Sequence, residues 1–151
     1  PTTAAPTIAM PQPTSTAKRR PVARPAGARQ LTPKQCSSTI DAMAFIEIAM
    51  RGIIKGYAAT PTIAAANFKT LPAVLGPDRR TLSRVRSYWL AAGYPATFPT
   101  VRDVDAMIGA ADRMLAAAKQ DDPTHLPEIY LDYNSALDQY TFDASNSLCP
   151  E

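Results

Sequence analysis

The sequence has very little of what metal and nucleophile chemistry usually requires. Its 151 residues include one histidine, His125, and two cysteines, Cys36 and Cys149. One histidine cannot form a histidine cage, and cysteines this far apart lack the spacing of a zinc site. Glycine is scarce, at 6 residues, and no glycine-rich phosphate loop, G-x-S-x-G or H-E-x-x-H motif occurs. The sequence therefore predicts a non-enzymatic protein with no catalytic residues, no metal and no cofactor.

Long apolar runs are also missing. A membrane-spanning helix needs about 20 consecutive, mainly apolar residues. A secretory signal needs a continuous apolar stretch after its basic residues. Neither pattern occurs in the sequence, so we expect the chain to have no transmembrane segment of its own.

Acidic residues are absent from the first 35 positions. These positions carry six basic residues: Lys18, Arg19, Arg20, Arg24, Arg29 and Lys34. The remaining positions carry 10 basic and 13 acidic residues, so the net charge of +3 divides into +6 and −3. Such a basic segment favours an anionic partner: nucleic acid, an acidic protein face or lipid headgroups.

Proline is concentrated in the same region. Of the 15 prolines, 7 lie in residues 1–33, where few large apolar residues occur. This composition cannot bury enough surface to offset the entropy lost on ordering. Residues 1–31 are therefore predicted to form an extended or disordered arm that is basic and rich in proline and alanine.

The first helix is predicted after this arm. Thr32-Pro33-Lys34-Gln35 combines a capping box with proline at the first helical position. Apolar residues then recur at three- and four-residue spacing, which indicates a buried stripe. The helix is expected to end near Ala59, before Thr60-Pro61.

Two further helices are predicted over residues 61–92. A short helix is expected to bend or stop at Pro72, and Gly76-Pro77-Asp78 indicates a turn and a new cap. The next helix would end at Gly93. Its outer face carries Arg79, Arg80, Arg84 and Arg86. This face is either solvated or docks on an acidic partner or a phosphate backbone.

The clearest amphipathic segments are residues 100–119 and 123–142. Thr100 would cap the first, and an acidic turn at Asp121-Asp122 would join the two as antiparallel neighbours. We explain the acid pairs Asp103/Asp105 and Asp121/Asp122 by their positions at helix starts. The tyrosines of the last segment are predicted to edge the core with their hydroxyls reaching water.

These patterns predict an all-α fold. It would be a four- to five-helix antiparallel bundle over residues 32–142, with an irregular tail over 143–151. Cys36 and Cys149 lie at the two ends of the helical region. They are either a disulfide that closes a long loop or two unrelated thiols in a reducing compartment.

A family resemblance is carried by the last two helices. The pattern is Asp112-x-x-Leu115-x-Ala117-Ala118-Lys119, a polar turn with Pro123-Thr124, then Tyr130-x-x-Tyr133-Asn134-x-x-Leu137. This stretch of about forty residues resembles the PsbQ-like extrinsic subunits of photosystem II. The resemblance implies a small basic four-helix bundle with a proline-rich N-terminal arm. It also implies a non-catalytic stabiliser of the oxygen-evolving region in the thylakoid lumen.

Three functions remain open from the sequence. The expected function is a structural subunit that docks through its arm onto larger protein subunits of a multi-subunit assembly. A PsbQ-like photosystem subunit and a virion structural protein both satisfy this description. The alternative is a nucleic-acid-binding protein whose arm neutralises phosphates. The expected partner-binding residues are the six basic residues of the first segment and the four arginines at positions 79–86.

Overall fold

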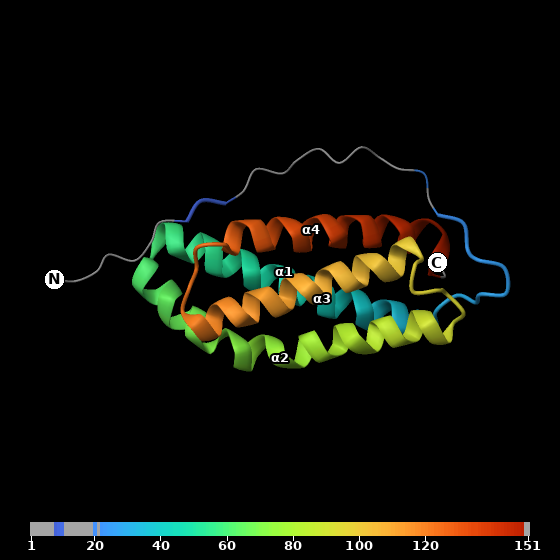
Figure 1. Cartoon of the computed structure of the whole chain (residues 1–151), viewed down its shortest axis with the longest axis horizontal. Coiled ribbons are helices and arrows are strands. Elements are labelled where there is room, and N and C mark those ends of the chain that lie inside the picture. The colour runs from blue at the N-terminus through green and yellow to red at the C-terminus, as the bar shows by residue number, and fades with distance from the viewer. Residues whose placement is uncertain (1–7, 11–19, 21, 150–151) are drawn as a thin grey trace.

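The four helices form an up-down-up-down antiparallel bundle (Figure 1). The structure is a computed structural model of the 151-residue chain, and it describes residues 8–10, 20 and 22–149. Consecutive helices pack side by side, and α4 closes the ring by packing on α1. Within the described residues there is no strand. The all-α bundle predicted from the sequence is therefore confirmed, with four helices.

Helix α1 spans Pro33–Ala59. Its capping box is formed: Gln35 N donates to Thr32 Oγ1 over 3.2 Å, and Thr32 N donates to Gln35 Oε1 over 3.0 Å. These bonds satisfy backbone donors that a helix start otherwise leaves without partners. The predicted bounds of this helix are confirmed.

Helix α2 is one continuous helix over Pro61–Ala91, so the prediction of two helices divided at Gly76-Pro77-Asp78 is wrong. Pro72 and Pro77 lie inside it. Each proline removes one backbone donor and normally bends or ends a helix. Here Leu71, Leu75 and Leu82 are at most 3% exposed. The burial of this stripe against the bundle outweighs the local helix-breaking signal.

Helix α3 spans Pro99–Gln120 and α4 spans Leu126–Asp143. Thr100 was predicted as the cap of α3, but it lies inside the helix with its side chain fully buried. Phe98 holds the capping position instead, and its extended backbone leads into Pro99 at the first helical position. The turn after α3 is longer than predicted, since α4 begins three residues after Pro123.

The predicted irregular tail is corrected over its described part. Asp143 is the last residue of α4, and Ala144–Leu148 continues as one π-helical turn. Ala144 and Leu148 are buried in the core. This turn brings Cys149 to the start of α1, where it forms a disulfide with Cys36 across a Cα–Cα distance of 6.2 Å.

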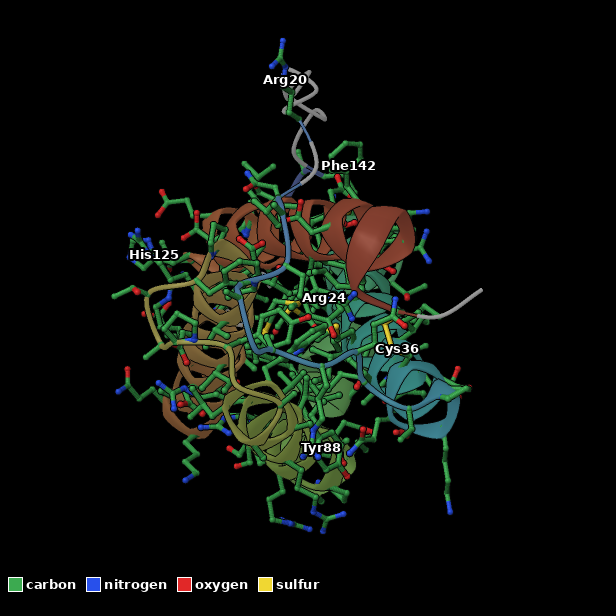
Figure 2. All side chains as sticks on the ribbon, turned by 90° about the vertical axis from the view of Figure 1, so that its right-hand side faces the viewer. Arg20, Arg24, Cys36, Tyr88, His125 and Phe142 are labelled. Carbon is green, nitrogen blue, oxygen red and sulfur yellow. A yellow bond between two sulfur atoms is a disulfide. The ribbon has the colours of Figure 1, made fainter. Side chains whose placement is uncertain are left out.

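The described parts of the N-terminal region pack on the bundle. Residues 22–31 cross the end of the bundle where α1 begins, α2 ends and α3 begins (Figures 1 and 2). Leu31 is 2% exposed and Ile8 is 6% exposed, and both belong to the core. None of the helices in the described residues is both long and apolar enough to cross a membrane.

Candidate functional site

The basic region is attached to the bundle through the end of α2. The backbone N–H of Arg29 donates to the carbonyl of Ala92 over 2.9 Å. Its guanidinium Nη2 donates to the carbonyl of Ala91 over 3.2 Å. Carbonyls at a helix C-terminus lack intrahelical donors and carry partial negative charge. Arg29 therefore stabilises this crossing directly, besides adding positive charge to the surface.

Arg24 lies over the centre of the same end of the bundle (Figure 2). Beneath this end, Tyr94 is 1% exposed and its ring packs edge-on against Trp89 and Phe98. Burial raises the pKa of the Tyr94 hydroxyl, and the charge of Arg24 acts in the opposite direction. Arg24 is thus near enough to act on a buried hydroxyl while its own side chain is exposed.

Two of the four predicted arginines in α2 are paired with carboxylates of α3. Arg79 donates to both carboxylate oxygens of Asp112, over 2.6 and 3.0 Å. Arg86 donates to Asp105 over 2.5 Å. Pairing of this kind neutralises much of the charge and fixes the side chains between the two helices. Arg79 and Arg86 are therefore engaged between α2 and α3.

The other two arginines of α2 are available. Arg80 and Arg84 are exposed, and neither has an ion-pair partner among the described residues. Lys34, in the first turn of α1, is also exposed, as is Arg20. Lys18 and Arg19 lie outside the described residues. The structure thus divides the predicted set into paired and accessible cations, a division that no spacing in the sequence reveals.

The bundle has a charge polarity that the sequence analysis missed. Helix α4 carries Glu128, Asp132, Asp138 and Asp143 and no basic residue. Helix α2 carries one acid, Asp78, against its four arginines and Lys69. These two helices lie across the bundle from each other, because α2 packs on α1 and α3 while α4 packs on the same two. Summing charge by helix, instead of over the whole bundle, would have found this polarity.

The tyrosines of α4 act in the core, and the expectation that their hydroxyls reach water is wrong. Tyr133 donates to the Met43 carbonyl over 2.9 Å, and the Trp89 indole donates to the Tyr140 oxygen over 3.1 Å. Tyr130 donates to the Glu47 carboxylate over 2.7 Å. Buried polar groups need such partners to avoid a desolvation cost. These tyrosines therefore hold α4 to α1 and α2.

The acid pairs are also placed differently from the prediction. Asp105 binds Arg86, as described above. Asp121 follows α3 with a left-handed backbone, φ 53°, and thus lies at a helix end instead of a helix start. Asp122 accepts hydrogen bonds from the backbone N–H and hydroxyl of Thr124. These bonds lower the pKa of Asp122. Both residues are accounted for by the turn between α3 and α4.

The remaining candidates for nucleophile and metal chemistry are separated from one another. His125 precedes α4, is exposed, and has Nδ1 3.5 Å from the Glu128 carboxylate. Both cysteines are used in the disulfide. In the part of the chain that the structure describes, no three ligating side chains gather as a metal site would require.

Comparison with known proteins finds no family model that matches the chain, no similar curated protein and no similar solved structure.

Proposed function

We propose that the protein is a non-catalytic structural subunit that docks onto larger protein subunits of an assembly through its basic N-terminal region. The proposal rests on the packing of this region against the bundle and on the exposure of its arginine side chains. Residues 22–31 are packed over one end of a disulfide-closed bundle. Arg24 lies in this segment and Arg20 lies before it, and both side chains are exposed (Figure 2).

The packed segment favours docking because its ordering is already partly achieved before a partner binds. Leu31 is buried, and Arg29 is hydrogen-bonded to the end of α2. A segment held in place loses less conformational entropy on association than a free one. Accessible cations in a fixed arrangement favour an acidic protein face, since complementary charge gives orientation and fast association.

The resemblance of the last two helices gives a more specific form of this proposal. In that form the assembly is a photosystem, and the chain is an extrinsic subunit of the PsbQ kind in the thylakoid lumen. An antiparallel four-helix bundle with a basic N-terminal region fits such a role. The proposal in its general form does not depend on the resemblance.

A nucleic-acid partner is the competing outcome. Proteins that bind phosphates unspecifically need many free Lys and Arg side chains on one surface, and their affinity falls steeply with salt. Here Arg79 and Arg86 are engaged with Asp112 and Asp105. A protein face is therefore the better match.

The test compares the full chain with two variants of equal charge loss. The Arg20→Ala/Arg24→Ala variant removes two exposed cations from the basic N-terminal region, which we call the docking region. The Arg102→Ala/Lys119→Ala variant removes two exposed cations from α3. Each is incubated with salt-washed large complexes from the source cells, and with duplex DNA and single-stranded RNA, at low and moderate salt.

We expect the chain to co-sediment with a large complex. The α3 variant should do the same, and the Arg20/Arg24 variant should lose about tenfold or more in affinity. Steeply salt-dependent binding to nucleic acid, without retention on any complex, would overturn the proposal. So would equal retention of both variants.

A further inference from the structure

The disulfide lies at the end of the bundle that residues 22–31 cross. Figure 2 shows its yellow sulfur–sulfur bond on the end facing the viewer, where Arg24 also lies. Cys36 is 6% exposed, whereas Cys149 is half-buried. Both line a hollow of about 390 Å³, together with Pro33, Ser37, Ile40, Ala144 and Ser145. Ser37, Ile40 and Ser145 are exposed, so the hollow opens to solvent beside the bond.

The segment that the bond holds at the C-terminal side is a single turn. Ala144–Leu148 is π-helical, and the backbone N–H of Cys149 donates to the carbonyl of Ala144 over 3.0 Å. Such turns are rare and occur frequently at functional sites. Ala144 and Leu148 are at most 1% exposed. One helical turn is not stable by itself, so the position of this C-terminal turn depends on its burial and on the disulfide.

The other half of the bond lies just after the docking region. Leu31 is 2% exposed and directly precedes Thr32, the cap of α1. The backbone N–H of Cys36 donates to the carbonyl of Thr32 over 2.9 Å. Leu31 and Leu148 both belong to the core. The disulfide therefore joins the C-terminal turn to the helix start from which the docking region leaves the bundle.

We infer that this disulfide is a redox switch. A dithiol reductant opens it in the folded protein, which releases the C-terminal turn and loosens the docking region while the four helices stay folded. Disulfides that solvent reaches are the ones typically used in regulation, whereas fully buried ones are inert. The effect on a partner rests on the proposed function, but the opening and the local release do not.

The two cysteines have different roles in the reduction. A thiolate of the reductant attacks the sulfur of Cys149, the more exposed of the two, and the electron pair of the broken bond passes to Cys36. Cys36 lies in the first turn of α1, where the partial positive charge of the helix start stabilises the departing thiolate. The second thiol of the reductant then displaces Cys149. The dithiol is oxidised to a disulfide, and its two protons pass to the two cysteines.

The first test measures how fast dithiothreitol reduces the folded protein, by counting free thiols at several urea concentrations. We expect a rate that is proportional to dithiothreitol and unchanged by urea below the unfolding transition. Ser37→Phe fills the hollow. The matched control is Ser38→Phe, also an exposed serine of α1 but not part of the lining. Ser37→Phe should slow the reduction about tenfold, and Ser38→Phe should leave it unchanged.

The second test measures the local release by amide hydrogen exchange. Cys36→Ser/Cys149→Ser represents the reduced form. Its control is the disulfide-bonded protein at a urea concentration that gives the same free energy of unfolding. Residues 22–31 and 144–149 should exchange about tenfold faster in the variant than in the control, because local opening adds to global unfolding. Exchange in α3 should be equal in both, and circular dichroism should show the helices intact.

Three results would overturn the inference. The first is a reduction rate that rises with urea in step with unfolding, since the bond would then open only in the unfolded chain. The second is an equal reduction rate for Ser37→Phe and Ser38→Phe. The third is exchange of residues 22–31 equal to that of the control, or loss of the helices in the double serine variant.

Co-sedimentation with the salt-washed complexes separates the switch from the proposed function. The double serine variant should lose about tenfold in affinity relative to the disulfide-bonded protein, because a loosened docking region must be ordered again on binding. Local release with no co-sedimentation of either form would overturn the proposed function and leave the switch standing. Equal co-sedimentation of both forms would overturn the control of docking by the switch.

Discussion

The Tyr130 hydroxyl of α4 donates a hydrogen bond to the Glu47 carboxylate of α1, with 2.7 Å between the oxygen atoms. Glu47 also pairs with Arg51, whose Nε lies 3.3 Å from the same oxygen. Tyr130 is 7% exposed, so water competes little for the hydroxyl. The three residues link the first helix to the last one along the side where α1 and α4 close the ring.

Removal of this hydroxyl should weaken the closure of the bundle. Tyr130→Phe is expected to lower the free energy of unfolding by about 1–2 kcal/mol, since a hydrogen bond to a charged group is stronger than a neutral one. Urea unfolding measures the change. A double-mutant cycle with Glu47→Gln isolates the pair. If the two single changes simply add, the hydroxyl and the carboxylate do not interact, and this account of the closure fails.

Stability should fall in alkaline solution, starting at the pH where the tyrosines of the unfolded chain ionise. Burial, followed by the hydrogen bond to Glu47, raises the pKa of Tyr130 to about 12. Burial also raises the pKa of Tyr133 and of Tyr140. An unfolded tyrosine ionises near pH 10. The folded state therefore retains protons that the unfolded state releases, and the stability is complete below about pH 10 and declines as pH rises toward 12.

Urea unfolding at several alkaline pH values checks this prediction. Tyr130→Phe should reduce the slope of stability against pH between about 10 and 12, because one of the responsible groups is removed. Phenolate absorbance of the folded protein should show part of the tyrosine signal titrating only as the protein unfolds. A full phenolate signal near pH 10 with the fold intact would contradict the burial of these hydroxyls.

Loss of the disulfide should destabilise the protein strongly. Cys36 and Cys149 are 113 residues apart. In the chain-entropy model a loop of this length stabilises the fold by about 4–5 kcal/mol, by restricting the unfolded chain. Cys36→Ser/Cys149→Ser, or the reduced protein, should therefore unfold at a clearly lower urea concentration. Unchanged stability after complete reduction would mean that the bond adds nothing to the fold.

Local signals predicted α1 well because they agree with the tertiary structure. Thr32, Pro33 and Gln35 form a cap whose partners are all within three residues of one another. The start of α1 can therefore be predicted from these neighbouring residues alone. The same applies to the apolar stripes of α3 and α4. Bundle architecture follows from such stripes and from short joints.

The errors occurred where distant residues decide the outcome. Pro72 and Pro77 signal a break, but the burial of α2 along its whole length keeps it continuous. Arg79 and Arg86 resemble free surface cations until α3 brings Asp112 and Asp105 beside them. The partners are 33 and 19 residues away, so no local pattern shows the pairing.

Helical glycines offer a matched test of packing. Gly109 has open space at its Cβ position, whereas Gly56 would place a Cβ 3.1 Å from Ala64. Alanine is a better helix former than glycine by about 1 kcal/mol. Gly109→Ala should therefore stabilise the protein by about 0.5–1 kcal/mol. Gly56→Ala should lose this gain, because α1 and α2 must separate slightly. Equal stabilisation of both variants in thermal unfolding would show that the crossing at Gly56 is not tight.

Gly93 should allow the docking region to pack closely against the end of the bundle. It has a left-handed backbone, φ 96°, and a Cβ there would be 3.3 Å from the Ala28 Cα. Gly27 also has positive φ, 78°, but open space around it. Alanine costs about 1–2 kcal/mol at such a backbone angle. Gly27→Ala should incur only this backbone cost, while Gly93→Ala should also displace residues 27–28 from the end of the bundle.

Limited tryptic digestion distinguishes the two glycine variants. Displacement of the segment weakens the bonds from Arg29 to Ala91 and Ala92. Cleavage after Arg29 should therefore be faster in Gly93→Ala than in Gly27→Ala, even where their unfolding free energies are similar. Faster cleavage in Gly93→Ala would link the turn after α2 to the presentation of Arg24. Identical cleavage rates would mean that Gly93 serves the turn alone and that the docking region is held by its other contacts.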